Sequence, residues 1–133
     1  MASVVFFVAA ECLYRNFVQM NYSQLNLTES LFKGLEDAGY TKCTPVQEKV
    51  LAVSLSGNDL YVQSQTGTGK TAAFLVTIIE QLLKKSDGKN ALILVPTREL
   101  AVQVEKEAKK LTKYTQLKTA SFFGGVGYEK QVE

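Results

Sequence analysis

The 133 residues are enough for one domain with a buried core, and they carry 46% hydrophobic and 21% charged side chains with a formal net charge of +2. This balance excludes a disordered or fibrous chain, and the weak positive charge allows a nucleic-acid partner without indicating one. With two cysteines and no histidine, neither a disulfide framework nor a zinc site is expected. We therefore predict a reducing, cytoplasmic setting without membrane attachment.

The first 19 residues differ in character from the rest. The apolar run inside "MASVVFFVAAECLYRNF" extends from Val4 to Ala10, which is too short to cross a bilayer, and neither Lys nor Arg precedes it, as a secretory signal would require. We expect residues 1–19 to be a non-native or disordered N-terminal extension, with a cleaved signal peptide as the less favoured alternative. Residues 20–133 are expected to form one partial domain without an internal linker.

Two amphipathic helices are predicted first. In "NLTESLFKGLEDAGY", Thr28 is a candidate N-cap and Gly39 a candidate end. In "CTPVQEKVLAVSLSGND", Thr44 is the candidate N-cap, Pro45 suits the first helical position, and residues 57–58 stop the helix. The inward positions are Leu31, Leu35 and Ala38 in the first helix and Val46, Val50, Leu51 and Ser54 in the second.

Three strands alternate with helices along the remaining chain. The strand candidates are "DLYVQS" (59–64), "ALILVP" (91–96) and "LKTASFFGG" (117–125), and a continuous apolar run such as the second is typical of a buried parallel strand. Helices are predicted after the first two strands, and "VGYEKQVE" (126–133) begins another. Their inward positions are Ala72, Leu75, Val76, Ile79, Leu82 and Leu83 in the first and Leu100, Val104 and Leu111 in the second. The alternation predicts an α/β fold, with a parallel sheet and helices on both faces.

A glycine-rich loop, "SQTGTGKT", joins the first strand to its helix. Gly67 and Gly69 let the backbone approach a ligand closely, and the loop N–H groups together with the helix N-terminus favour an anion. Lys70 can reach the outer phosphates of a nucleotide, and the Thr71 hydroxyl can coordinate Mg²⁺. The segment meets the P-loop pattern G-x-x-x-x-G-K-[ST], except that Ser64 stands at its first position.

Two other interpretations of this loop remain. Gly67, Gly69 and Ala72 also fit the dinucleotide fingerprint G-x-G-x-x-A, but that fold needs an acidic residue at the end of its second strand, where "VPTR" offers none. The other interpretation is a tight strand-to-helix turn without any ligand, and the adjacent Lys70 and Thr71 argue against it. Nucleotide binding is the interpretation that the residues favour.

Further motifs stand in order around the loop. "GYTKCTPVQ" (39–47) precedes it, "PTRELA" (96–101) follows it, and Gly124 and Gly125 come later. Together, from about residue 22 to the last residue, these motifs resemble the N-terminal RecA-like domain of DEAD-box ATP-dependent RNA helicases. The resemblance implies a partial RecA-like P-loop NTPase domain over 20–133, with ATP and Mg²⁺ as cofactors and single-stranded or short duplex RNA as partner.

The resemblance also implies roles for individual residues. In the family, an upstream aromatic ring and the first motif recognise adenine, the P-loop holds the phosphates, and the last two motifs line the path of single-stranded RNA. The implied nucleotide contacts are Tyr22, Thr44, Gln47, Ser64, Gln65, Thr66, Gly67, Thr68, Gly69, Lys70 and Thr71. Lys70 and Thr71 are also the implied catalytic residues, with Thr71 on Mg²⁺ bound through the nucleotide. The implied RNA contacts are Pro96, Thr97, Arg98, Gly124 and Gly125.

Several of these residues have a purely structural alternative. Thr44 and Gln47 fit a capping box, which helix stability alone would explain, although both roles can coexist. Thr97 is also a helix N-cap, so Arg98, whose planar donors match a phosphate, is the better candidate for an RNA contact. The glycine pair is compatible with a simple turn. The lysines of 106–118 are expected to form a solvated helix face rather than an RNA groove.

The 133 residues contain neither an acidic "DEAD" box nor a second RecA-like domain. Hydrolysis needs a carboxylate to hold Mg²⁺ and usually an arginine to stabilise the transition-state charge, and the family draws its arginines from that second domain. We therefore expect this chain, a monomer, to bind nucleotide but to show little or no ATP hydrolysis and no unwinding. A DNA helicase or translocase motor and a non-catalytic nucleotide- or RNA-binding interaction module remain the alternatives.

Overall fold

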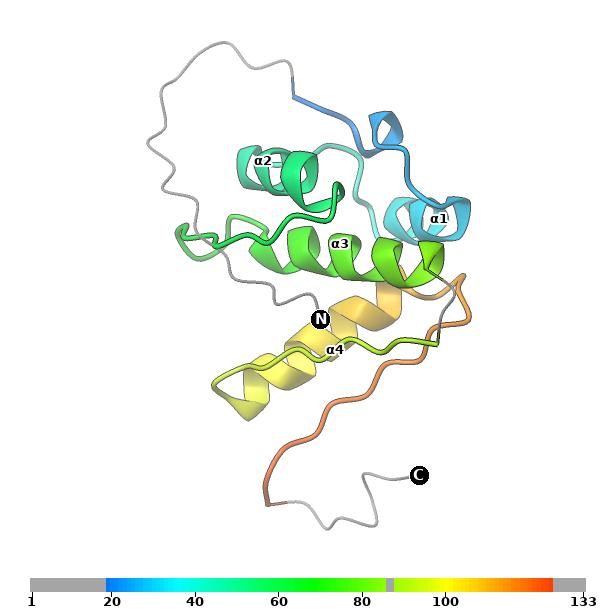
Figure 1. Ribbon diagram of the computed structural model, residues 1–133. Coiled ribbons are helices and arrows are strands. Elements are labelled where there is room, and N and C mark those ends of the chain that lie inside the picture. The colour runs from blue at the N-terminus through cyan, green and yellow to red at the C-terminus, as the bar shows by residue number, and fades with distance from the viewer. Residues whose placement is uncertain (1–18, 86–87, 126–133) are drawn as a thin grey trace.

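Four α-helices and one short 3₁₀-helix make up the named elements of the computed structural model, which describes residues 19–85 and 88–125 (Figure 1). The elements are η1 (Tyr22–Gln24), α1 (Glu29–Asp37), α2 (Pro45–Ser54), α3 (Lys70–Lys84) and α4 (Arg98–Leu111). Helix α3 is central, because α1, α2 and α4 all pack against it. Within the described ranges, every helix is too short or too polar to cross a membrane. Residues 1–18 of the expected N-terminal extension (1–19) and the helix predicted at 126–133 lie outside the described residues.

The helices begin and end at the predicted signals. The Thr44 hydroxyl accepts a hydrogen bond from the N–H of Gln47 at 3.4 Å, and the Thr97 hydroxyl accepts one from the N–H of Leu100 at 3.2 Å. After α1, Gly39 adopts the left-handed conformation with a φ of 82°, which ends the helix. These N-caps and this helix end are confirmed.

A distant carboxylate fixes the start of α1. Thr28 occupies the predicted N-cap position, but its side chain makes no capping bond. Its backbone N–H instead donates to both carboxylate oxygens of Glu80, at 3.1 and 2.9 Å, and the Lys84 ammonium lies 3.0 Å from the same carboxylate. Because Glu80 is only 1% exposed, this contact ties α1 to the buried face of α3.

The core lies between α3 and the helices around it. Most positions predicted to face inward are buried, and the exceptions are half-buried: Ala38, Leu82, Leu83 and Leu100. The main cluster consists of Tyr22, Leu31, Leu35, Cys43, Leu51, Leu75, Val76, Ile79, Val104, Ala108 and Leu111. Helices α1 and α4 approach closely at Gly34, where an added Cβ would stand 2.3 Å from the carbonyl oxygen of Leu111. Glycine is therefore required at this point of the interface.

Helices α2 and α3 share a buried polar contact and a second apolar cluster. The Ser54 and Thr77 hydroxyls lie 2.6 Å apart, and Thr77 also donates to the carbonyl of Ala73 at 3.0 Å, so that these buried groups are satisfied. The apolar cluster consists of Val46, Val50 and Ala73, with Leu60 and Val62 packed against it. This packing holds the segment 59–64 beside α2 and α3, directly before the glycine-rich loop.

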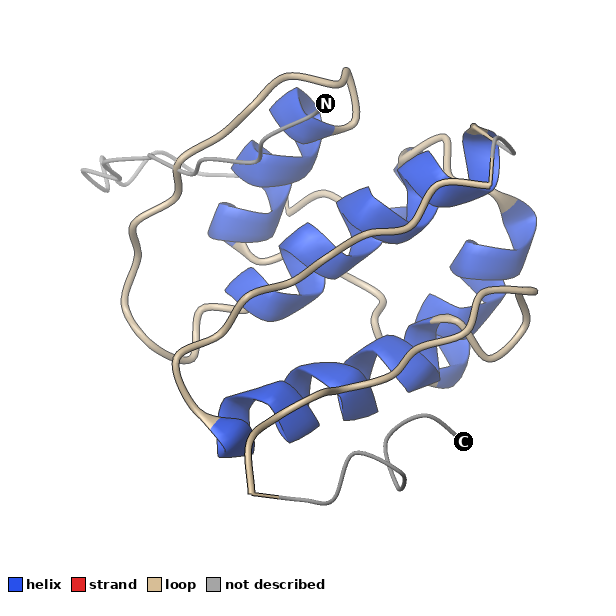
Figure 2. Cartoon of the chain, turned by 60° about the horizontal axis from the view of Figure 1, so that its bottom comes forward, coloured by secondary structure: helices blue, strands red, loops and turns tan. Residues whose placement is uncertain are grey.

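The three segments predicted as strands form no β-ladder within the described residues, and Figure 2 draws them as loops. In the segment 91–96, Ile93 and Val95 pack against the core, whereas the alternate Leu92 and Leu94 are each 84% exposed. A strand in a sheet needs hydrogen-bonded neighbours about 4.8 Å away along its edges. Contacts with the core cover one side of this segment without supplying such neighbours, and it pairs with no other segment among residues 19–85 and 88–125.

Candidate functional site

The glycine-rich loop enters α3 through two left-handed glycines. Gly67 has a φ of 78°, and Gly69, the N-cap residue of α3, has a φ of 86°. Residues with a Cβ rarely adopt this region. The first N–H groups of α3 have no carbonyl partner inside the helix, and they coincide with the positive end of its dipole. Thr71 lies in this first turn and is half-buried. The arrangement suits an anion such as a phosphate.

Lys70, the first residue of α3, folds back onto the loop. Its ammonium donates to the carbonyl oxygens of Ser64 and Gln65, at 2.5 and 2.6 Å, and to the Ser64 hydroxyl at 3.1 Å. The Ser64 hydroxyl also lies 2.7 Å from the Thr68 hydroxyl. The loop is thus closed around the Lys70 ammonium.

The start of α2, with its N-cap Thr44, is hydrogen-bonded to the same loop. The Thr44 hydroxyl donates to the carbonyl of Thr68 at 2.8 Å, and the Gln47 amide donates to the carbonyl of Gly69 at 3.2 Å. The Gln47 amide oxygen accepts from the Thr44 N–H at 2.8 Å, which completes the capping box. Gly69 is needed here for space as well, because an added Cβ would lie 2.4 Å from the Gln47 amide nitrogen. The structural role of Thr44 and Gln47 is therefore present together with a direct contact to the loop.

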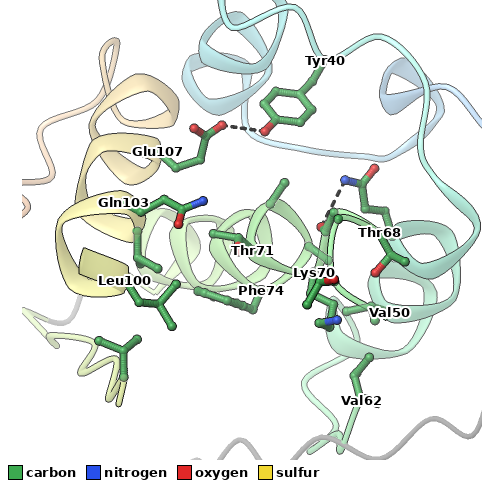
Figure 3. A pocket seen from close by; sticks show the side chains of 18 residues that line it. Tyr40, Val50, Val62, Thr68, Lys70, Thr71, Phe74, Leu100, Gln103 and Glu107 are labelled. Atoms are coloured by element: carbon green, nitrogen blue, oxygen red, sulfur yellow. Dashed lines mark hydrogen bonds between the residues drawn. The ribbon is translucent and has the colours of Figure 1, made fainter. Parts of the chain in front are cut away.

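A cavity of about 740 Å³ lies between the loop, α3 and α4 (Figure 3). Residues 66–74 line it from the loop and α3, and Leu100, Gln103 and Glu107 line it from α4. At one end of the cavity the Tyr40 hydroxyl donates to the Glu107 carboxylate at 2.5 Å. The cavity is thus bordered by the Lys70 end of the loop and by a tyrosine–carboxylate pair.

Neither Tyr40 nor Glu107 is among the site residues predicted from the sequence. Burial, followed by the hydrogen bond to Glu107, raises the pKa of Tyr40. Burial alone would raise the pKa of Glu107, but hydrogen bonds from Tyr40 and Lys110 outweigh it and lower that pKa, so the carboxylate is charged at neutral pH. The sequence held a signal for Glu107, because this acid falls on the inward stripe of α4 with Val104 and Leu111.

Tyr22 lies in the core rather than along this cavity. It is fully buried, and its ring meets that of Tyr40 edge-on with centroids 6.0 Å apart. Burial, and then the neighbouring Cys43, raise the pKa of Tyr22, and burial raises the pKa of Cys43 to about 11. The structure therefore does not bring Tyr22 to the loop, and its stacking on adenine stays a prediction.

A second group of predicted residues meets at the start of α4. The Arg98 guanidinium lies against Gly125, where an added Cβ would stand 2.5 Å from a guanidinium nitrogen and where φ is 85°. Gly124 has open space around it. Pro96, Thr97 and Arg98 are exposed. Arg98 of the motif "PTREL" and Gly125 are thus brought together outside the cavity lining, whereas Leu100 of the same motif lines the cavity.

Comparison with known proteins shows to which family the chain belongs. Residues 44–133 match the family model described as DEAD/DEAH box helicase. The chain belongs to this family. The matched range begins at the N-cap of α2 and includes the glycine-rich loop, the start of α4 and the glycine pair.

Curated members of the DEAD/DEAH box family are similar to most of this chain. The ATP-dependent RNA helicase RhlB of Pseudomonas aeruginosa (strain UCBPP-PA14) is 46% identical over 119 residues, which are 84% of this chain and 30% of the relative. RhlB of Xanthomonas axonopodis pv. citri (strain 306) is 46% identical over 121 residues, which are 86% of this chain and 21% of the relative. The chain therefore spans less than a third of the length of these relatives.

Solved DEAD-box structures have the same fold over the matched part. The RNA helicase Prp28 from Chaetomium thermophilum, bound to ADP, has a TM-score of 0.76 at 36% identity, covering 86% of this chain and 29% of that one. A DEAD box protein from Methanococcus jannaschii has a TM-score of 0.77 at 37% identity, covering 85% of this chain and 31% of that one. The predicted fold class, part of a RecA-like α/β domain, is confirmed by these similarities.

Proposed function

We propose that the chain is the ATP-binding part of an ATP-dependent RNA helicase that unwinds or remodels RNA. ATP binds at the loop 64–71, and single-stranded or short duplex RNA contacts the residues at 96–98 and Gly125, with Gly124 in the same turn. Hydrolysis also needs an acidic box and the arginines of a second RecA-like domain, neither of which these 133 residues contain, so the chain alone holds nucleotide with little or no turnover. It acts as a monomer in the cytoplasm.

The observation that carries this proposal is the hydrogen-bonded contact between the start of α2, with its N-cap Thr44, and the loop. Gln47 bonds to Gly69 and Thr44 bonds to Thr68, so the start of α2 lies next to the loop. A ligand with a base near Gln47 and phosphates at the loop would therefore contact the start of α2 and the loop at the same time. A nucleoside polyphosphate has this shape. The loop also fits the phosphates, since it offers an ammonium, helix N–H groups and glycines that leave the backbone open. The Thr71 hydroxyl would join Mg²⁺ that the phosphates bring.

Gln47 can recognise adenine without giving up its structural contacts. An amide nitrogen has two N–H donors, and an amide oxygen accepts two hydrogen bonds. The contacts with Gly69 and Thr44 use one donor and one acceptor position. A second donor and a second acceptor position therefore remain for the edge of an adenine, which presents both kinds of group.

The RNA path is supported by the position of Arg98 beside Gly125. The guanidinium is exposed, and its planar donors match the geometry of a phosphate. Because contacts to the sugar-phosphate backbone position a nucleic acid without reading its sequence, we propose that these residues hold RNA of many sequences.

The test is a calorimetric titration of the chain with ATP and Mg²⁺, followed by fluorescence anisotropy with a labelled single-stranded RNA and with the DNA of the same sequence. We expect ATP binding, stronger binding of RNA than of DNA, and no RNA-stimulated phosphate release. Equal binding of RNA and DNA would favour the DNA helicase or translocase motor, and ATP binding without either nucleic acid would favour the interaction module. No ATP binding would refute the proposal, and rapid phosphate release would contradict the expected lack of turnover.

Variants at the start of α4 and at the glycine pair test the RNA path. Arg98→Ala is expected to weaken RNA binding about tenfold, because a charge-assisted hydrogen bond to phosphate contributes roughly 1.5–3 kcal/mol and water replaces part of it. Gly125→Ala should have a similar effect, because its Cβ would displace the Arg98 guanidinium and alanine disfavours a φ of 85°.

Gly124→Ala is the matched control for Gly125→Ala. An added Cβ meets nothing within 4 Å at this position, so RNA affinity should change less than about twofold. Anisotropy titrations measure all three variants, and calorimetry with ATP should show unchanged nucleotide affinity. Equal losses in Gly124→Ala and Gly125→Ala would contradict the positioning of Arg98 by Gly125.

A further inference from the structure

All three donors of the Lys70 ammonium are engaged in the conformation described here. An ammonium has three N–H donors, and three loop oxygens accept from this one: the carbonyls of Ser64 and Gln65, at 2.5 and 2.6 Å, and the Ser64 hydroxyl, at 3.1 Å. A phosphate that binds to Lys70 must therefore draw the ammonium away from at least one of these oxygens.

Ser64 stands where the P-loop pattern has glycine, which carries no hydroxyl. Its hydroxyl contacts the Lys70 ammonium and also lies 2.7 Å from the Thr68 hydroxyl. Thr68 in turn donates to the carbonyl of Gln65 at 2.9 Å. One side-chain hydroxyl thus connects the beginning of the loop, its middle and the first residue of α3.

We propose that the Ser64 hydroxyl acts as a clamp, which stabilises the closed loop and thereby lowers its affinity for polyphosphate. The clamp rests on the proposed function, because it regulates the same nucleotide site. Ser64 is a positioning residue, since it acts through Lys70. The clamp is partial, because the carbonyls of Ser64 and Gln65 still accept from Lys70 when the hydroxyl is removed.

Ser64→Ala tests the clamp with ATP and ADP as probes. Loss of one charge-assisted hydrogen bond from the closed loop is expected to lower both dissociation constants about five- to tenfold. The melting temperature without nucleotide should stay the same or fall slightly, because the closed loop loses a contact. The clamp thus predicts a higher affinity without a gain in stability, whereas a merely structural role would lower both.

Two further variants control this experiment. Ser64→Thr keeps the hydroxyl and should retain wild-type affinity. Ser56→Ala removes the hydroxyl of an exposed serine after α2 and should change neither affinity nor melting temperature. Calorimetry measures ATP and ADP binding to all four proteins, and circular dichroism measures thermal unfolding.

Each outcome decides for or against the clamp. The clamp is supported if Ser64→Ala binds ATP and ADP more tightly than wild type and the other two variants do not. It is also supported if Ser64→Ala is the only one of the four proteins that binds measurably. Unchanged or weaker binding in Ser64→Ala, with ATP binding in wild type, overturns the clamp and leaves the proposed nucleotide site intact. Tighter binding in both Ser64→Ala and Ser64→Thr overturns it too, because the hydroxyl is then not responsible. No binding by wild type or Ser64→Ala overturns both the clamp and the proposed site.

Discussion

Replacing Lys70 by alanine is expected to weaken ATP and ADP binding about 100-fold. The ammonium lies within the loop at the N-terminus of α3, from which it can reach the outer phosphates of a nucleotide. Hydrogen bonds from a charged donor to phosphate contribute on the order of 3 kcal/mol, and each 1.4 kcal/mol is a factor of ten in affinity. The variant also loses the hydrogen bonds between Lys70 and the loop, which favours nucleotide binding because the loop no longer has to open. This gain offsets only part of the loss of affinity, because the phosphates lose the ammonium that would contact them.

Calorimetric titration with ATP and Mg²⁺ measures this effect. Lys49→Ala is the matched control, since it removes the charge of an exposed lysine on α2 and should leave the affinity unchanged. Thermal unfolding of both variants verifies that the fold is kept, because the described contacts of Lys70 lie within the loop. An affinity of Lys70→Ala within threefold of wild type would count against the P-loop assignment.

Replacing Glu80 by alanine is expected to lower the free energy of unfolding by about 3 kcal/mol, as removal of a buried, paired charge commonly does. The variant loses the two contacts to the Thr28 N–H and leaves that donor without its acceptor. Lys84→Ala removes the other partner of Glu80, but this ammonium side chain is 57% exposed. Its loss should cost about 1 kcal/mol or less, as for other solvent-exposed ion pairs.

Urea unfolding followed by circular dichroism compares the two variants. Glu80→Gln keeps the size of the side chain and one acceptor oxygen, so its loss of stability should lie between those of Glu80→Ala and Lys84→Ala. If Lys84→Ala were as destabilising as Glu80→Ala, the ion pair within α3, rather than the contact with the Thr28 N–H, would account for the stability lost in Glu80→Ala.

Local signals are sufficient to predict the helices and the loop. The start of α2 follows from Thr44 and Pro45, because an N-cap and a first-turn proline act within a few residues. The left-handed conformations of Gly67 and Gly69 follow in the same way from the pattern of the loop. The order of the motifs predicts the fold class, which the family match and the solved structures confirm.

Contacts between distant residues are not predictable from local patterns. Glu80 looks like a surface acid within "TIIEQLL", yet its partner is the Thr28 N–H, 52 residues away in the chain. The pair of Tyr40 and Glu107 joins elements whose relative position no local pattern gives. The apolar run 91–96 indicates a strand, but pairing depends on which segments lie beside it, and the run alone carries no information on its neighbours.

The two outward-facing leucines of the segment 91–96 affect the solubility of the chain. Leu92 and Leu94 present apolar surface on a stretch of backbone that forms no ladder within the described residues. Such a stretch is a template for pairing with another chain, since its N–H and C=O groups can bond along an edge while the leucines exclude water. The continuous apolar run that is typical of a buried strand therefore leads us to expect that a concentrated solution of the chain aggregates.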